Sequence, residues 1–288
     1  MLYEELLRDQ PYLSLARFAR EAGVPAWTLR DARQQQARQQ AREQEQQVVL
    51  EQVRTVALKH PTYGYRRVHQ VLHGAAGEPP TLNLLGKHTV RLALGALGLN
   101  PPLPRKGRKK AVLAAHETLW PAGRRVQMDA TRFTLADGVC WAYLVLDVET
   151  RAVLHLHVIR SLSALSAVTA LRAGVAVLRA QGIDDELLVM TDGGSDFTSG
   201  LFQDTCQSFG DWVRAKVSQR GGMGILERTN RTLKYEFVFR EEFSSMQELR
   251  AGVDRFLNWY NHIRLHSALG YGCPWIKLLE TANTRNAA

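Results

Sequence analysis

Cysteine is scarce in this sequence. Cys140, Cys206 and Cys273 are its three cysteines among 288 residues, and long stretches of chain separate them. An odd and scattered set cannot build a disulfide framework or the Cys pairs of a structural zinc module. We therefore expect reduced thiols, a cytoplasmic location and no structural zinc.

The chain also lacks a long apolar run, a signal sequence and any excess of acidic residues, which argues against a membrane partner. Its 37 Lys and Arg residues exceed its 28 Asp and Glu residues, for a net charge of +9. This charge indicates an acidic partner, and nucleic acid is the candidate that remains. A basic protein kept soluble by its charge would have the same composition. A chain of this length holds two or three domains.

Two acidic residues stand where catalytic carboxylates are often found. The apolar run 187–190 leads to Asp192 at a Gly-Gly break, which is typical of a buried strand that ends at the carboxyl edge of a sheet. Ligands tend to bind at that edge. Glu227 follows a glycine-rich stretch and begins a segment with helical spacing of Leu226, Thr229, Asn230 and Leu233. Arg231 and Lys234 therefore share a helix face with Glu227.

A third acid, Asp129, lies on a segment that alternates around Val126 and Met128, which predicts a strand. Three carboxylates near one point repel one another unless a cation neutralises them, and hard oxygen ligands suit Mg²⁺ or Mn²⁺. In a two-metal site, one ion prepares the nucleophile and the other stabilises the leaving oxygen of a phosphoryl transfer. Asp129, Asp192 and Glu227 are therefore candidate metal ligands and catalytic residues.

These acids resemble the DDE triad of the integrase-type transposases of bacterial insertion sequences, OrfB-like proteins related to retroviral integrases. Between Asp192 and Glu227 lie 34 residues, close to the habitual spacing of about thirty-five in that group. The resemblance runs through four segments in order: Tyr63–Val68, Thr191–Ser199, Glu227–Lys234 and Trp259–Gly270. One departure is the glycine-rich stretch 221–224, where the group usually has a polar loop.

The resemblance implies a DNA transposase in which the three acids hold two Mg²⁺ or Mn²⁺ ions. Water would nick the ends of the element, and the freed 3′-hydroxyl would then attack target DNA. Because two ends are joined, the resemblance implies a homodimer or a larger synaptic assembly, and it leaves room for a separately encoded end-binding partner. Two other functions stay open: a ribonuclease H-type nuclease, and a non-catalytic DNA-binding protein derived from a transposase.

The amino-terminal region predicts DNA binding. Residues 15–30 fit a helix-turn-helix, with a Gly-Val-Pro turn and a second short helix that would bring Arg30 to DNA. An ordinary helical hairpin is the alternative. Residues 33–47 are polar on every face, which predicts an exposed helix or linker that ends the region 1–47. The apolar residues Val49, Val53 and Val56 follow, so self-association here stays open.

Residues 48–100 predict one helix after His60 and another over 88–97, and together these resemble the second helical DNA-binding module that precedes the catalytic core in these transposases. Residues 101–120 predict an extended basic linker that follows a phosphate backbone. For each cation, a solvated basic face is the alternative. The predicted DNA-binding residues are Arg30, Arg66, Arg67, Arg91, Arg105, Lys106, Arg108, Lys109, Lys110, Arg231 and Lys234.

Residues 121–240 predict an α/β catalytic core with a mixed five-stranded sheet. The expected strands are 125–135, 139–148, 152–159, 187–190 and 212–217, and the expected helices are 163–180, 202–209 and one containing Glu227. Three strands in a meander, followed by helix, strand, helix, strand and helix, is the order of a ribonuclease H-like fold. Residues 241–288 predict a helical extension that begins with an amphipathic helix over 246–260.

Other acids near the proposed centre have structural explanations. Asp137 falls in a turn, Asp147 ends the second strand and Asp196 follows a loop. Asp196 is the most plausible substitute for Asp192 as a metal ligand. Arg264 and His266, in the last of the four segments, are candidates to reach DNA or Glu227.

Overall fold

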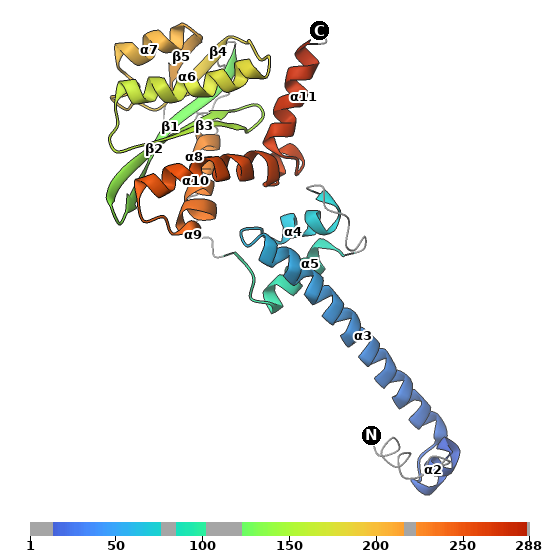
Figure 1. Cartoon of the computed structure of the whole chain (residues 1–288). Coiled ribbons are helices and arrows are strands. Elements are labelled where there is room, and N and C mark those ends of the chain that lie inside the picture. The colour runs from blue at the N-terminus through green and yellow to red at the C-terminus, as the bar shows by residue number, and fades with distance from the viewer. Residues whose placement is uncertain (1–13, 76–84, 102–122, 216–222, 287–288) are drawn as a thin grey trace, which may run out of the picture. The chain divides into compact units, whose positions relative to one another are not determined.

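The computed structural model describes residues 14–75, 85–101, 123–215 and 223–286. The chain divides into two compact units (Figure 1). Of the described residues, 14–72 and 85–101 form the first unit, and the others form the second. No helix in the described ranges combines the length and the apolar character needed to cross a membrane.

The first unit begins with two helices joined by a tight turn. Helix α2 (Leu15–Glu21) starts at Ser14, whose Oγ accepts a hydrogen bond from the Arg17 amide at 3.2 Å. Gly23, with φ of +67°, allows the turn. Helix α3 (Ala26–Lys59) then continues for 34 residues. The second helix of the predicted helix-turn-helix is therefore long, and the expectation of a short helix was wrong. The helix also has no break near residue 47, where one region was expected to end.

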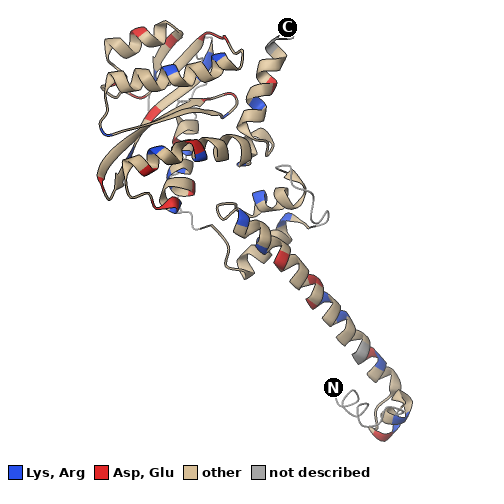
Figure 2. Ribbon diagram, in the orientation of Figure 1, with Lys and Arg blue, Asp and Glu red and all other residues tan. Residues whose placement is uncertain are grey.

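The polar middle of α3 is stabilised by local interactions. Gln, Arg, Ala and Glu are strong helix formers, and Gln39 Nε2 donates to Glu43 Oε1 at 3.0 Å one turn further on. Figure 2 shows both basic and acidic residues along this helix. The end of α3 contacts α4 (Tyr65–Leu72) and α5 (Lys87–Ala96). Val53 and Val56 are buried, so these two apolar residues belong to the core of the unit.

The second unit is built on a five-stranded sheet of order β3-β2-β1-β4-β5. Strands β1, β2 and β3 form an antiparallel meander, β4 runs parallel to β1, and β5 runs parallel to β4. The strands are β1 (Arg124–Leu135), β2 (Gly138–Asp147), β3 (Val153–Ile159), β4 (Leu187–Thr191) and β5 (Gly210–Arg214). β5 begins two residues before the expected start, at Gly210, where φ is +147° and a side chain would collide with the backbone of Leu187.

Helices cover both faces of this sheet (Figure 1). Along β2, side chains alternate between the faces: Tyr143 joins one apolar core and Leu144 the other. The first core includes residues of α6 (Ala164–Ala180), α7 (Gly200–Gln207) and α11 (Pro274–Asn286). The second includes residues of α8 (Gly224–Thr232) and α10 (Met246–Asn258). This order of strands and helices confirms the expected ribonuclease H-like fold.

Two helices of the second unit continue into wider, π-helical turns. α8 is followed by η2 (Leu233–Val238) and the short α9 (Phe239–Glu241). α10 is followed by η3 (Trp259–Ile263), and a 3₁₀ turn η4 (Ser267–Leu269) comes before α11. Single π-helical turns are rare and are often found at functional sites.

Asp147 has a structural role at the end of β2. Its two carboxylate oxygens accept hydrogen bonds from Arg124 Nε at 2.9 Å and Arg124 Nη2 at 2.7 Å. Both side chains are fully buried. The Thr150 amide and hydroxyl also donate to Asp147. A buried charge pair of this kind is stable only when its remaining hydrogen bonds are satisfied, and Thr150 satisfies them on the acid.

Candidate active site

Asp129 lies on β1, and Asp192 directly follows β4, the parallel neighbour of β1. β1 pairs with β4 in a register that sets Gln127 opposite Met190, an offset of 63 residues, and the same offset separates Asp129 from Asp192. Asp192 follows the last residue of β4 directly. Adjacent strands are about 4.8 Å apart, so continuing this register sets the two acids side by side at the carboxyl end of β4.

Glu227 is exposed in the first turn of α8, and this helix is hydrogen-bonded to β1 at two points. Gln127 Oε1 accepts a hydrogen bond from the Leu226 amide at 3.2 Å. Asn230 Nδ2 donates to Asp129 Oδ2 at 2.8 Å. The element that carries the third acid is therefore tied to the strand that carries the first.

The three acids interact electrostatically. Burial raises the pKa of Asp129 from 3.8 to about 6, and repulsion by Asp192 and, more weakly, by Glu227 contributes to the rise. A hydrogen bond from the Ala130 amide at 2.8 Å and the charge of Lys234 act in the opposite direction. Within the described ranges, no three His, Cys, Asp or Glu side chains converge closely enough to form a ready metal site. The three acids are therefore near one another, but their carboxylate oxygens do not converge on one point.

Asn230 is a residue of this site that the sequence analysis missed. Its side chain is 8% exposed, and its Oδ1 is buried with no hydrogen-bond partner among the described residues. The helical spacing of Asn230 with Leu226 and Leu233 indicates that it points inward. Spacing cannot identify its partner Asp129, because that residue lies 101 positions earlier in the chain.

Asp192 and Asp196 have different surroundings. Asp192 is exposed, and its Oδ1 accepts a hydrogen bond from the Gly194 amide at 3.0 Å. Asp196 is buried, and the Tyr143 hydroxyl donates to its Oδ2 at 2.5 Å. Burial, together with this hydrogen bond to an acid, raises the pKa of Tyr143. Asp196 is therefore engaged in the core, whereas Asp192 faces solvent.

Comparison with known proteins finds similarity to one protein family and to one transposase. Residues 212–274 match the Integrase core domain family, and this stretch contains Glu227. The transposase for insertion sequence element IS904 of Lactococcus lactis subsp. lactis (strain IL1403) is 25% identical over 244 residues, which cover 80% of this chain and 93% of that protein. The chain is similar to the integrase-type transposases of insertion sequences. The resemblance expected from the sequence is confirmed.

The solved structures that are similar to this chain include retroviral integrase catalytic cores. The HTLV-2 integrase catalytic core domain in complex with magnesium is 18% identical, with a TM-score of 0.41, and the match covers 54% of this chain and 94% of that one. The BIV integrase catalytic core domain is also 18% identical, with a TM-score of 0.43, and the match covers 57% of this chain and 98% of that one.

Two residues of the last resembling segment, Arg264 and His266, were expected to reach DNA or Glu227, but both are buried. Arg264 is buried and donates to both carboxylate oxygens of Glu236, so it reaches neither Glu227 nor the surface. His266 is also buried, with Nε2 3.3 Å from the Tyr260 carbonyl oxygen. The expectation for Arg264 was wrong because the inward-facing Glu236 attracts this cation into the protein.

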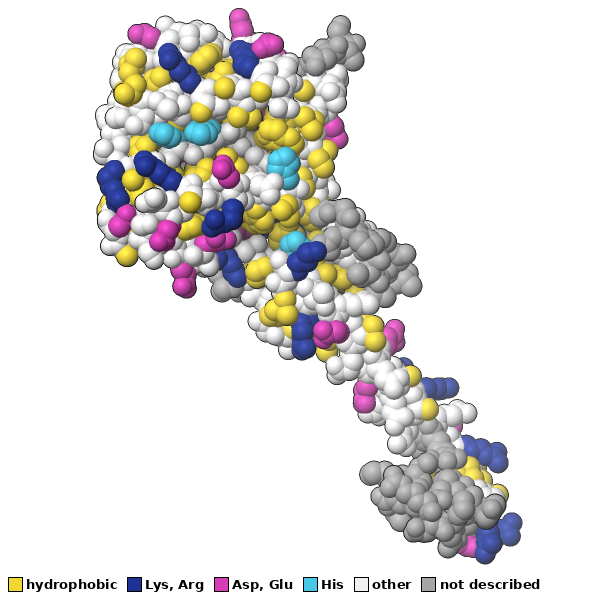
Figure 3. Space-filling model, viewed as in Figure 1, with side chains coloured by type: hydrophobic (Ala, Val, Ile, Leu, Met, Phe, Trp, Pro, Cys, Tyr) yellow, Lys and Arg dark blue, Asp and Glu magenta, His cyan; other side chains and the backbone are white. Residues whose placement is uncertain are grey.

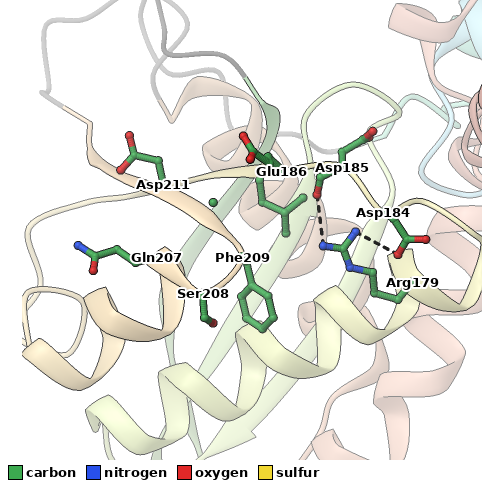
Figure 4. A pocket seen from close by; sticks show the side chains of 10 residues that line it. Arg179, Asp184, Asp185, Glu186, Gln207, Ser208, Phe209 and Asp211 are labelled. Atoms are coloured by element: carbon green, nitrogen blue, oxygen red, sulfur yellow. Dashed lines mark hydrogen bonds and ion pairs between the residues drawn. The ribbon is translucent and has the colours of Figure 1, made fainter.

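A separate pocket lies at the amino ends of β4 and β5 (Figure 4). Arg179, Asp184, Asp185, Glu186 and Asp211 are among the residues that line it. Arg179 pairs with Asp184, with Nη1 3.2 Å from Oδ1. The pocket contains none of the three acids of the candidate site. It lies at the opposite end of these strands from Asp192 and is not part of that site.

The predicted DNA-binding residues of the first unit lie on its helices. Arg30 is exposed on α3, and Arg91 is exposed on α5. Arg66 is exposed on α4 and donates from Nε to the Tyr65 hydroxyl at 3.1 Å. The Arg67 guanidinium lies 5.3 Å from the centre of an aromatic ring, that of Tyr63. Five further residues fall outside the described ranges: Arg105, Lys106, Arg108, Lys109 and Lys110.

The predicted DNA-binding residues of the second unit lie on the helix that carries Glu227. Arg231 is exposed one turn beyond Glu227. Lys234 is half-buried, with its Nζ 5.6 Å from the ring centre of Phe133. Burial lowers the pKa of Lys234, and the nearby Asp129 raises it. On the face of this unit seen in Figure 3, basic and acidic side chains are interspersed, so this view shows no broad basic surface.

Proposed function

We propose that this chain is a DNA transposase that cleaves the ends of an insertion sequence and joins them to target DNA. Two comparisons support the proposal: the match to the Integrase core domain family and the similarity to the IS904 transposase. The observation that carries it is the raised pKa of Asp129, to which both Asp192 and Glu227 contribute, and the register of β1 and β4, if continued by two residues, supports the same grouping.

In this proposal Asp129, Asp192 and Glu227 are the catalytic residues and hold two Mg²⁺ or Mn²⁺ ions. The donors suit such ions because all are hard carboxylate oxygens. The raised pKa of Asp129 supports the same view, because it reflects negative charge that a cation would offset. Asn230 Oδ1 supplies a further unpaired oxygen beside Asp129. Bound Mg²⁺ supplies activation of the attacking hydroxyl and stabilisation of the leaving oxygen in phosphoryl transfer.

The cations of α8 and η2 bind and orient the DNA in this proposal. Arg231 extends from the same exposed helix face as Glu227, one turn further on, and suits a phosphate that approaches the acids. The Lys234 ammonium lies against the Phe133 ring and interacts electrostatically with Asp129. Its ammonium therefore balances part of the negative charge of the site before DNA arrives.

The remaining parts of the chain have proposed roles as well. Residues 1–47 and 48–100 would bind transposon ends, residues 101–120 would follow the DNA backbone, residues 121–240 would perform the chemistry, and residues 241–288 would cover the core. Because two ends are joined in one reaction, the proposed active form is a homodimer or a larger synaptic assembly that acts at the nucleoid. A separately encoded partner for end recognition is compatible with this arrangement.

A strand-transfer assay tests the proposed function. The full chain is mixed with Mg²⁺ and labelled duplexes taken from the DNA that flanks its coding region, and nicked and joined products are separated. We expect joining by the wild type, with losses of roughly 10²-fold or more in Asp129→Asn, Asp192→Asn and Glu227→Gln, and with gel-shift binding retained. Asp254→Asn, which removes an exposed acid of α10, serves as the charge control.

Each other outcome has a clear meaning. Full joining by Glu227→Gln would overturn the assignment of the third acid. Cleavage without joining by the wild type would indicate a ribonuclease H-type nuclease. Binding without metal-dependent nicking would indicate a DNA-binding protein that has lost catalysis.

A further inference from the structure

The segment after α10 is hydrogen-bonded to the helix that carries Glu227. Arg264 donates from Nε to Glu236 Oε2 at 2.9 Å and from Nη2 to Glu236 Oε1 at 2.7 Å. Nη2 also lies 3.3 Å from Thr232 Oγ1. The two charged side chains are only 7% and 10% exposed. This is a two-pronged, charge-assisted contact, which is both stronger and more directional than a neutral hydrogen bond.

A second contact joins the same two segments nearer to the acids. The hydroxyl of Tyr260, in η3, lies 3.2 Å from Thr229 Oγ1 in α8. Thr229 immediately precedes Asn230, which donates to Asp129. Thr229 is buried, whereas Glu227, two residues before it, is exposed on the other side of the helix. The contacts from η3 and Arg264 therefore hold the inner face of the helix and leave its outer face open.

The same segment is also anchored to the sheet. Asn261 Nδ2 donates to the Val153 carbonyl at 2.8 Å, and Asn261 Oδ1 accepts from the Val153 amide at 3.0 Å. Val153 is the first residue of β3. Neighbouring residues of η3 thus contact α8 through Tyr260 and the sheet through Asn261. The segment connects the helix of Glu227 to the sheet of Asp129 by a second route, besides the direct bonds of α8 to β1.

The helix itself needs such support. α8 has nine residues, and helices this short are marginal unless packing holds them. It continues into the π-helical turn η2, which contains Glu236. A change of helical pitch alters which residues face inward, so an inward contact at Glu236 fixes the helix in one rotational setting.

We propose that Arg264, Glu236 and Tyr260 are positioning residues that set the rotation of α8 and so the placement of Glu227 against Asp129. The proposal rests on the proposed function in so far as Glu227 is catalytic. These residues act through the helix and touch neither substrate nor metal. A displacement of about 1 Å at a reacting group can lower a rate by roughly 10²-fold, so a loosened α8 should slow the chemical step without weakening DNA binding.

The chain offers a matched control for this test. Arg124 holds Asp147 through the same pair of atoms, Nε and Nη2, at 2.9 and 2.7 Å. Both of those side chains are fully buried, and the pair joins the start of β1 to the end of β2. Arg264→Lys and Arg124→Lys each retain the charge and lose the two-pronged geometry. Only the first change affects the contact with the helix of Glu227.

The experiment measures amide hydrogen exchange and strand transfer in the full-length variants. We expect both variants to lose stability. In Arg264→Lys, the α8 amides should exchange roughly tenfold faster than in the wild type, and kcat for joining should fall roughly 10- to 100-fold. KM for DNA should stay within about twofold, because uniform binding is unchanged. In Arg124→Lys, α8 exchange and kcat should match the wild type.

Three results would overturn the proposal: unchanged α8 exchange in Arg264→Lys, unchanged kcat in that variant, or equal changes in Arg124→Lys. If Arg264→Lys does not fold, Tyr260→Phe decides, because it removes only the hydroxyl that contacts Thr229. That variant should show faster α8 exchange and a lower kcat, and wild-type values for both would reject the proposal. Amide hydrogen exchange does not depend on catalysis. If the wild type failed to join DNA, the proposed function would be rejected, but the exchange rates would still show whether Arg264 and Tyr260 hold α8.

Discussion

Asn230 Nδ2 lies 2.8 Å from Asp129 Oδ2, so a residue of α8 holds the side chain of an acid on β1. The two residues are 101 positions apart in the chain. Glu227 lies one turn before Asn230 on the same helix. The hydrogen bond therefore couples the orientation of one proposed metal ligand to the position of another.

Removing this hydrogen bond should slow the reaction more than it weakens the fold. In Asn230→Ala, Asp129 loses the donor that fixes its Oδ2, and we expect joining to fall roughly tenfold or more at unchanged gel-shift affinity. Asn258→Ala, which removes an exposed amide from α10, is the control. Wild-type joining rates in Asn230→Ala would show that Asp129 needs no such support.

The pKa of Asp129 predicts a pH-dependent stability of the metal-free protein. Because its pKa is raised from 3.8 to about 6 in the folded state, the folded protein binds this proton more tightly than the unfolded chain. Its contribution to stability is present at low pH and is lost as the pH rises through about 6. Asp129→Asn should therefore stabilise the second unit, and its advantage should grow by about 1–2 kcal/mol between about pH 5 and pH 8.

Urea unfolding in the presence of a chelator measures this effect at both pH values. Added Mg²⁺ should reduce the difference between Asp129→Asn and the wild type, because a cation compensates the repulsion. An advantage of Asp129→Asn that is the same at both pH values would contradict the raised pKa.

Two adjacent glycines in the loop after β4 should differ in their tolerance of a side chain. At Gly194, a Cβ would lie 2.5 Å from Asp196 Oδ1 and 3.3 Å from Asp192 Oδ1, so Gly194→Ala should displace the loop that carries Asp192. At Gly193, a Cβ would meet only the flexible end of Arg214. We expect joining to fall roughly tenfold or more in Gly194→Ala and to change little in Gly193→Ala. Equal activities of the two variants would argue against a fixed loop.

Arg231 and Lys234 should contribute to DNA binding through phosphate contacts. If each neutralises one phosphate, Arg231→Gln and Lys234→Gln should each reduce the slope of log affinity against log salt concentration by about 0.9. Arg172→Gln, which removes an exposed cation from α6, is the control and should retain the wild-type slope. Fluorescence anisotropy with a labelled duplex at several salt concentrations gives these slopes. A wild-type slope in Arg231→Gln would place that cation away from the DNA.

The elements of the catalytic core could be predicted because local patterns determine them. Alternation around Val126 and Met128 predicted β1, and the Gly-Gly break after the run 187–190 placed Asp192 at the end of β4. The length of α3 was also in the sequence, since no Gly or Pro interrupts Ala26–Lys59. The polar composition of 33–47 suggested a boundary, but strong helix formers without a stop signal continue a helix.

The contacts that join these elements could not be predicted. Glu236 and Arg264 are 28 residues apart. Their pairing depends on two π-helical turns, which the periodicity of the sequence does not predict. In the sequence Gln127 is one polar position in a strand, yet its side-chain oxygen accepts a hydrogen bond from the Leu226 amide in the first turn of α8. Such partners follow from how helices pack on a sheet, which residue spacing along one element does not determine.

β1 continues to Leu135, although its pairing with β4 ends at Gln127. A strand that extends past its neighbour offers backbone groups to other chains, and such edges promote aggregation unless they are blocked. Here the Ala130 amide is already engaged by Asp129 Oδ1. The acid proposed for catalysis thus also shields its own strand, and alanine at position 129 would release that amide to any β-segment nearby. Asparagine retains an oxygen acceptor, so it removes the charge and leaves the strand protected.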